Sequence, residues 1–219
     1  LYAASSVKVG KGDVRNFNIS LLEASKYTVS IATRDIETIR KKWNLCKPKH
    51  KGTPYIVRPN NSAPYKSGSL TKSFLQDGAN MMSFIRYVAG IPDEVVLNGD
   101  INNRSQHGAV IISKDGIDYG WTFYAEDYNY FSDNPPKPAD MSDSFYKIAY
   151  SGVQYSMLNK GSKSLDKLIF DTMADVKFFN GDVGGRRMVL SPPLKQIGFG
   201  FADNFSVFDY MDKSRNIIF

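Results

Sequence analysis

The 219 residues suffice for one large domain, and a hydrophobic fraction of 42% with 13% aromatic residues excludes a disordered chain. No apolar run reaches the roughly 18 residues that cross a bilayer, and the single cysteine, Cys46, excludes an intrachain disulfide and a thiolate metal cluster. The formal net charge of +6 favours anionic partners, but no zinc-finger, helix-turn-helix or aromatic RNA-binding pattern accompanies it, so nucleic acid is not expected.

The domain organisation is expected to be simple. Residues 1–34 are assigned to an N-terminal extension, and residues 35–219 to a single domain that includes a basic helix and a proline-rich wrap at 35–70. Between residues 46 and 70, four prolines stand among glycine, asparagine and serine residues. This composition is typical of an extended connection along a surface, not of a hinge between domains.

Basic residues crowd near the start of this domain, at positions 40–42 and 47–51. The favoured interpretation is a solvated helix end that runs into a basic loop. The alternative is a positively charged face that attracts acidic lipid or an anionic wall polymer.

Three helices are expected in the first half of the chain. Apolar residues recur at helical spacing over 35–45 and over 70–90, where Gly90 and then Pro92 are expected to end the second helix. Residues 101–113 are also expected to be helical. The lone Cys46, beside apolar neighbours, is interpreted as a small buried side chain and not as a nucleophile.

Two further helices are expected in the second half. Asp140 is a candidate N-cap for a short helix over 141–149, and Ser164 is a candidate N-cap for a helix over 165–176. The second of these has an uninterrupted apolar stripe, which indicates a core-facing helix and not a cofactor groove.

The last part of the chain has the pattern of a β-hairpin. Strand-forming residues at 196–202 and 205–212 flank Asp203 and Asn204, which are typical turn residues. Helices that precede strands in this way indicate a sheet covered by helices, so the sequence predicts an α/β sandwich.

Four segments resemble, in order, the CAP superfamily (cysteine-rich secretory, antigen 5 and pathogenesis-related proteins) in its bacterial SCP-like branch from Firmicutes. The resemblance implies a three-layer α-β-α sandwich with a central antiparallel sheet. It also implies secretion or display at the cell surface. The segments are SAPYKSGSLTKSFLQDGANMMSFIRYVAGIPDEVVLN (62–98), RSQHGAVI (104–111), NPPKPADMSDSFY (134–146) and VGGRRMVLSPPLKQIGFGF (183–201).

The resemblance also implies where a cleft site stands and what it lacks. Many CAP domains hold a divalent metal with two histidines and two acidic residues, a sensible donor set for zinc. The first histidine position falls here on Asp133 or Asn134, the second on Gly185, and one acidic position near Ser156. Neither imidazole is present, so we expect no catalytic residue, no metal and no cofactor.

Other polar residues have alternative interpretations. His107 falls outside the family's metal positions and is expected to be a surface or hydrogen-bonded helix residue, while His50 is expected to be solvated. Arg186 and Arg187 match family residues and are expected to pair with a carboxylate or with backbone carbonyls to hold a strand in place. The alternative is that Arg186 captures an anion in the vacated cleft.

An irregular loop over residues 117–131 is rich in aromatic side chains and carries acidic residues. Aromatic groups at this density can stack on sugar rings or anchor a protein partner, and the alternative is that the loop buries them against its own sheet. Its acidic residues, near Asp133, are either solvent-facing or a glycosidase-like pair. The candidate ligand-binding residues are Trp121, Tyr124, Glu126, Tyr128 and Arg186.

Three functions are therefore carried forward. The first is a secreted, non-catalytic CAP-like module that binds a surface protein, a glycan or a lipid. The second is a metal-dependent or proteolytic enzyme with a rearranged site that uses Asp133, Glu126 or His107. The third is a structural domain of a larger wall-associated protein. Since even intact CAP domains are diverse in activity, the fold alone does not choose among them.

Overall fold

The computed structural model describes residues 35–115, 137–154, 156–174 and 184–215, together with two short strands near the start of the chain. Those strands, β1 (Asn16–Asn18) and β2 (Thr28–Ser30), pair antiparallel. The chain divides into two compact units, Leu1–Lys41 and Lys42–Phe219. Apart from the start of the first helix, the other helices and strands belong to the second unit. No helix within the described ranges has the combination of length and hydropathy that a membrane span requires.

Helices form where the apolar spacing predicted them. α1 (Ile36–Cys46) and α2 (Lys72–Ala89) confirm the predictions over 35–45 and 70–90. α3 (Gly99–Asp115) covers the prediction over 101–113 and continues beyond it at both ends. Cys46 is buried, as expected for a small apolar side chain.

The ends of α2 show why this helix begins and stops where it does. The Thr71 hydroxyl accepts the N–H of Phe74 at 3.3 Å, which satisfies one of the unpaired donors of the first turn. Gly90 adopts a left-handed conformation with φ of 82°, and its N–H returns to the carbonyls of Arg86 and Tyr87. The predicted stop at Gly90 is confirmed, because glycine enters this region without a steric cost.

α4 (Asp143–Val153) begins later than predicted. Its N-cap is Ser142, whose hydroxyl accepts the N–H of Phe145 at 3.3 Å. The prediction that Asp140 caps this helix is wrong, because its carboxylate instead accepts the hydroxyl of Tyr65 at 2.9 Å. α5 (Leu165–Ala174) confirms the next prediction, with Leu165, Leu168 and Ile169 fully buried.

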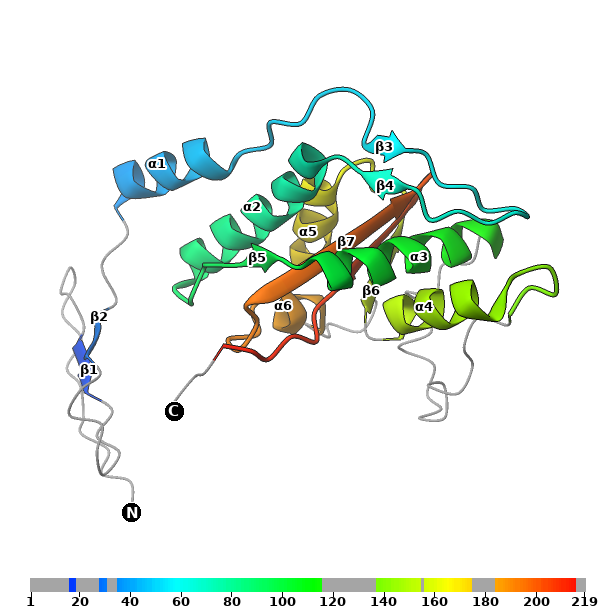
Figure 1. Ribbon diagram of the computed structural model, residues 1–219. Coiled ribbons are helices and arrows are strands. Elements are labelled where there is room, and N and C mark those ends of the chain that lie inside the picture. Colours follow the sequence, from blue (N-terminus) through cyan, green and yellow to red (C-terminus); the bar gives the residue numbers. More distant parts are fainter. Residues whose placement is uncertain are drawn as a thin grey trace, which may run out of the picture. The chain divides into compact units, whose positions relative to one another are not determined.

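The extended connection over 46–70 contains a strand pair that the sequence did not predict. β3 (Tyr55–Val57) pairs antiparallel with β4 (Ser69–Leu70), with a register shift between Tyr55 and Val57. Asn60 and Lys66 exchange backbone hydrogen bonds of 2.8 and 3.0 Å inside the loop that joins the strands. The connection is therefore held in place before α2 starts (Figure 1).

The main sheet has four strands in the order β5-β7-β8-β6. The predicted hairpin is confirmed, and its turn places Asp203 at φ of 53°. The expected fully antiparallel sheet is wrong at one edge, where β5 runs parallel to β7. This follows from α3, because β5 leads directly into a helix that runs in the same direction as β7. The strands are β5 (Val96–Leu97), β6 (Ser156–Lys160), β7 (Gln196–Ala202) and β8 (Phe205–Asp209).

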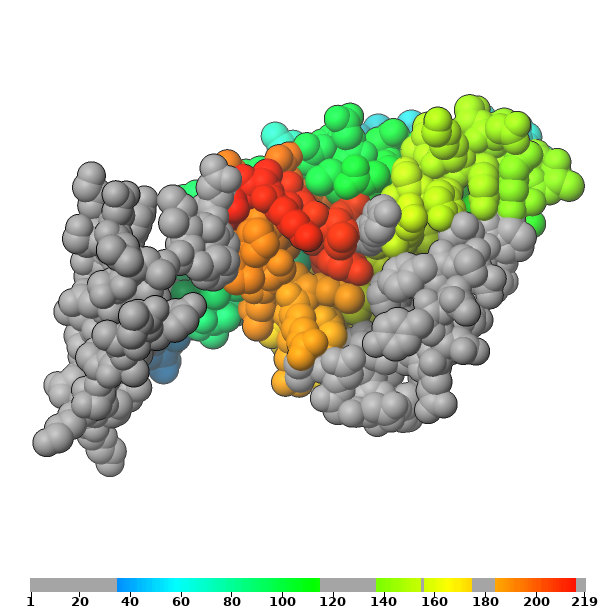
Figure 2. All heavy atoms as spheres, turned by 90° about the horizontal axis from the view of Figure 1, so that it is seen from below, coloured from blue at the N-terminus to red at the C-terminus, as the bar shows by residue number. Residues whose placement is uncertain are grey.

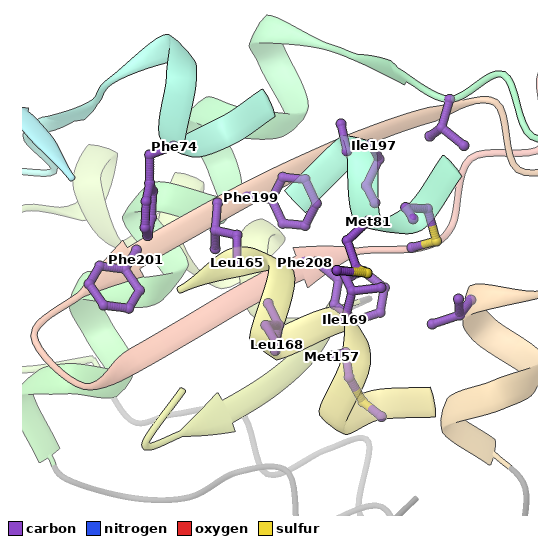
Figure 3. Close-up of a cluster of buried hydrophobic side chains, with 14 of the residues drawn as sticks. Phe74, Met81, Met157, Leu165, Leu168, Ile169, Ile197, Phe199, Phe201 and Phe208 are labelled. Carbon is purple, nitrogen blue, oxygen red and sulfur yellow. The ribbon is translucent and has the colours of Figure 1, made fainter. Parts of the chain in front are cut away.

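Helices cover both faces of this mixed sheet, which gives an α/β structure (Figure 1). α2, α5 and α6 (Gly184–Val189) supply one core together with Phe199 and Phe208 (Figure 3). α3 and α4 supply the other, together with Val207 and Leu158. Successive strand residues alternate between these two cores, as expected for side chains that point to opposite faces of a sheet.

α3 lies unusually close to β7. A Cβ atom at Gly200 would collide with the backbone of Ser105, and one at Gly198 would collide with the backbone at Ile101 and Asn102. The absence of side chains on this face of β7 therefore permits the contact. The GFGF segment that resembles the family motif is here a strand with phenylalanine on one face and glycine on the other.

Side-chain amides of α3 extend the hydrogen bonding of β7 beyond the end of β5. The amide oxygen of Asn102 accepts the N–H of Phe199 at 2.9 Å, and that of Gln106 accepts the N–H of Phe201 at 2.9 Å. The amide nitrogen of Gln106 donates to the Phe201 carbonyl at 3.0 Å. The spacing fits, because four helical residues rise about 6 Å and two strand residues span about 6.6 Å.

Arg86 is a fully buried cation that holds the segment leading into β7. Its guanidinium donates to the carbonyls of Pro92, Val189, Ser191, Pro192 and Leu194 at 2.8–3.4 Å. Burial lowers the pKa of Arg86 to about 10, so the group remains charged at neutral pH. Backbone carbonyls accept its hydrogen bonds, while the nearby charge of Asp93 favours the protonated guanidinium.

Candidate functional site

α6 carries the position that the resemblance assigns to the second histidine. Gly185 is buried in the first turn of this helix and offers no side chain to a ligand. The neighbouring Arg186 is exposed, and its Nε donates to the carbonyl of Met173 at 2.9 Å. Figure 2 shows the segment around α6, in orange, at the surface of the molecule.

The contact of Arg186 agrees with the structural interpretation of this residue, with one correction. Arg186 reaches a backbone carbonyl, as expected, but it lies on a helix and contacts the end of α5. The expectation that it holds a strand is therefore wrong.

Ser156 opens β6 and is almost completely buried, at 1% exposure. It lies opposite Asp209 of β8 in the strand register, and its hydroxyl has no hydrogen-bond partner within the described ranges. Ser156 shares its side of β6 with Leu158, which packs with α3 and α4. Val189 of α6 packs in the other core, so Ser156 and α6 lie on opposite faces of the sheet.

Beside Ser156 lies an ion pair that sequence reasoning missed. The Asp209 carboxylate is buried at 1% exposure and accepts Nε of Arg104 at 2.8 Å and its terminal nitrogen at 2.6 Å. The N–H of Met211 donates to the other carboxylate oxygen at 3.0 Å. Arg104 is the first residue of the RSQHGAVI segment, and nothing within that segment predicts an ion pair with a residue so distant in sequence.

The remaining predicted site residues fall within 116–136, outside the described residues. They are Asp133, Asn134, Trp121, Tyr124, Glu126 and Tyr128. Their assignment to the cleft or to a ligand surface stays a prediction.

His107 lies on α3 as a hydrogen-bonded helix residue, as predicted. Its Nδ1–H donates to the carbonyl of Asn103 at 2.8 Å, and its ring packs against Phe145 in a tilted arrangement with centroids 4.6 Å apart. Burial lowers the pKa of His107, which favours the neutral ring. In the described ranges, no group of three or more His, Cys, Asp or Glu residues is arranged to hold a metal ion.

His50 differs from its prediction. It was expected to be solvated, but its Nδ1 lies 2.9 Å from the Ser73 hydroxyl and its ring packs edge-on against Phe74. Its Nε2 is buried and has no hydrogen-bond partner within the described ranges. The cause is Asp77 of α2, a buried carboxylate that accepts the backbone N–H groups of Lys49 and His50 at 2.8–3.0 Å.

The basic loop is therefore tied to α2 and not free. Asp77 satisfies two of its backbone donors, and the N–H of Thr71 donates to the Pro54 carbonyl at 2.8 Å. The lysine side chains at 47, 49 and 51 remain exposed around this anchored backbone.

Comparisons with protein-family models, with curated proteins and with solved structures gave no match for this chain.

Proposed function

We propose that this chain is a CAP-like, extracellular binding module whose cleft carries no catalytic histidine pair. The proposal depends on what the structure shows at two neighbouring residues of α6, Gly185 and Arg186. Gly185 is buried without a side chain, and Arg186 beside it is bonded to the end of α5. Gly185 has no side chain and Arg186 carries a cationic guanidinium, so neither residue supplies the imidazole that acid–base catalysis or metal binding would use at this position.

The rigidity of the surrounding scaffold supports a binding role. Arg86 holds the segment between α6 and β7 through backbone carbonyls on both sides of the turn, and the Gln106 amide joins α3 to β7. A surface built on fixed elements recognises a partner at a lower entropic cost than a loose one. The expected partner is a protein, a glycan or a lipid of the cell surface.

The test is a calorimetric zinc titration of the purified chain beside the Asp133→His/Gly185→His variant, with Gly185→His alone as a control. We expect no binding heat from the native chain and recovered binding in the double variant, because the two imidazoles return the two nitrogen ligands that the resemblance assigns to this site. Tight zinc binding by the native chain would overturn the proposal and put the enzyme with a rearranged site in first place.

A further inference from the structure

The segment from Lys47 to Lys72 is basic and contains no acidic residue. It carries six lysine or arginine side chains, at 47, 49, 51, 58, 66 and 72, and all six are exposed. None of them forms an ion pair with a carboxylate of the described residues. Asp140 and Asp203 reach the neighbourhood from other elements, where they contact Tyr65 and Asn61 respectively.

Two large apolar side chains stand in the middle of this basic segment. Ile56 is 69% exposed and Val57 is 53% exposed, both on strand β3. In a regular strand, consecutive side chains point to opposite faces, and one of them would be expected to pack inward. The register shift between Tyr55 and Val57 accompanies the exposure of both, while Tyr55 itself packs against Phe201.

The backbone beneath these side chains is fixed. The Asp77 carboxylate accepts the backbone N–H groups of Lys49 and His50. Two further backbone hydrogen-bond contacts hold the rest of the segment: the N–H of Thr71 donates to the Pro54 carbonyl, and Asn60 and Lys66 pair with each other. The guanidinium of Arg58 lies 5.7 Å from the centre of the Tyr55 ring, which further orders the end of β3. The segment thus presents its cations and its apolar pair from one anchored stretch of chain.

We infer that residues 47–72 dock on an anionic lipid bilayer, with Ile56 and Val57 entering the interfacial region and the surrounding lysines contacting acidic headgroups. This inference rests on the proposed binding function and names its partner. Basic residues flanking exposed apolar side chains are the chemistry that anionic membranes select, because both buried apolar area and charge contribute to binding. A soluble anionic polymer uses the lysines alone and leaves Ile56 and Val57 in water.

Co-sedimentation of the full chain with vesicles provides the test. The two compositions are phosphatidylcholine alone and phosphatidylcholine with about one third phosphatidylglycerol, a mixture that gives a negative surface potential. We expect binding only to the anionic vesicles, and weaker binding in high salt because the charges are screened.

Two variants separate the contributions. Lys47→Gln/Lys49→Gln/Lys51→Gln is expected to weaken binding at least tenfold, since each basic residue near the surface contributes roughly a fivefold factor. Ile56→Ser/Val57→Ser is expected to weaken it about tenfold through lost apolar burial. The matched controls are Lys163→Gln/Lys195→Gln/Lys213→Gln and the exposed Val96→Ser, which should change neither binding nor the thermal midpoint.

Equal binding of the Ile56→Ser/Val57→Ser variant and the native chain, with retained binding to soluble polyphosphate, would overturn the membrane inference in favour of an anionic polymer. The proposed binding function would then still stand. No binding to either vesicle would overturn the inference as well. The zinc titration decides the proposed function separately, because it concerns α6 and does not involve β3.

Discussion

Phe199 and Phe201 on one face of β7 pack into an apolar core with α2 and α5, whereas Gly198 and Gly200 on the other face let α3 approach the strand backbone itself. The first contact depends on the volume of side chains, which neighbours can adjust by changing rotamer. The second is a contact between the backbone of β7 and the backbone of α3, and a backbone atom cannot shift without moving the whole element. Adjacent residues of β7 therefore differ in the substitutions that they tolerate. A phenylalanine can be exchanged for another apolar side chain of similar volume, whereas a glycine cannot be enlarged without displacing α3.

The largest effect is expected at Arg86, a charged side chain of α2 that is fully buried. Arg86→Met keeps the volume but leaves several carbonyls without donors, so we expect a loss of about 3–5 kcal/mol in the free energy of unfolding. Urea denaturation measures it, with the exposed Arg187→Met as a control. A neutral or stabilising Arg86→Met would mean that this face is held by apolar packing alone.

Gly200→Ala tests the close face. The added methyl group meets the Ser105 backbone, so we expect a loss of about 3 kcal/mol, at the upper end of the overpacking range. Gly99→Ala, in open space at the start of the same helix, should change stability by less than about 0.5 kcal/mol. Similar thermal midpoints for the two variants would show that α3 moves away at little cost. The proposed difference in tolerance between the two faces of β7 would then be wrong.

A smaller effect is expected at Gln106. Gln106→Ala removes the acceptor for the Phe201 N–H and the donor to its carbonyl, which should cost about 1–3 kcal/mol. Hydrogen exchange of the Phe201 amide should quicken in the variant, while Gln76→Ala, at an exposed amide of α2, should leave that amide unchanged. Unaltered exchange at Phe201 would mean that burial alone protects it.

The sequence predicted the elements whose signal is local. Helical periodicity located α1, α2 and α5, an apolar run located α3, and strand-forming residues on both sides of a turn located the β7–β8 hairpin. The parallel β5 was missed because two residues carry no periodicity, and the β3–β4 pair was missed because prolines and glycines mask short strands. Asp140 and Ser142 are both good capping residues, and only the partner Tyr65 decides between them.

The candidate site was less accessible to sequence reasoning, since its features depend on residues far apart in the chain. The absence of a side chain at Gly185 is readable directly. The Arg104–Asp209 ion pair requires α3 to lie against β8, and the contacts of His50 with Ser73 and Phe74 require Asp77 to hold the basic loop against α2. No sequence pattern within either segment predicts these contacts. Once the structure shows that the carboxylates of Asp77 and Asp209 are buried, a hydrogen-bonding or ionic partner is expected for each of them.

The amide contacts of α3 have a further consequence for how copies of the chain behave at high concentration. Beyond the two residues paired with β5, β7 would otherwise present free N–H and C=O groups along one side, a template on which another chain can add a strand. Asn102 and Gln106 instead bind the N–H groups of Phe199 and Phe201 and the carbonyl of Phe201 from within the same molecule. The close approach of α3, which Gly198 and Gly200 permit, therefore also covers the part of the β7 edge on which another strand could otherwise pair.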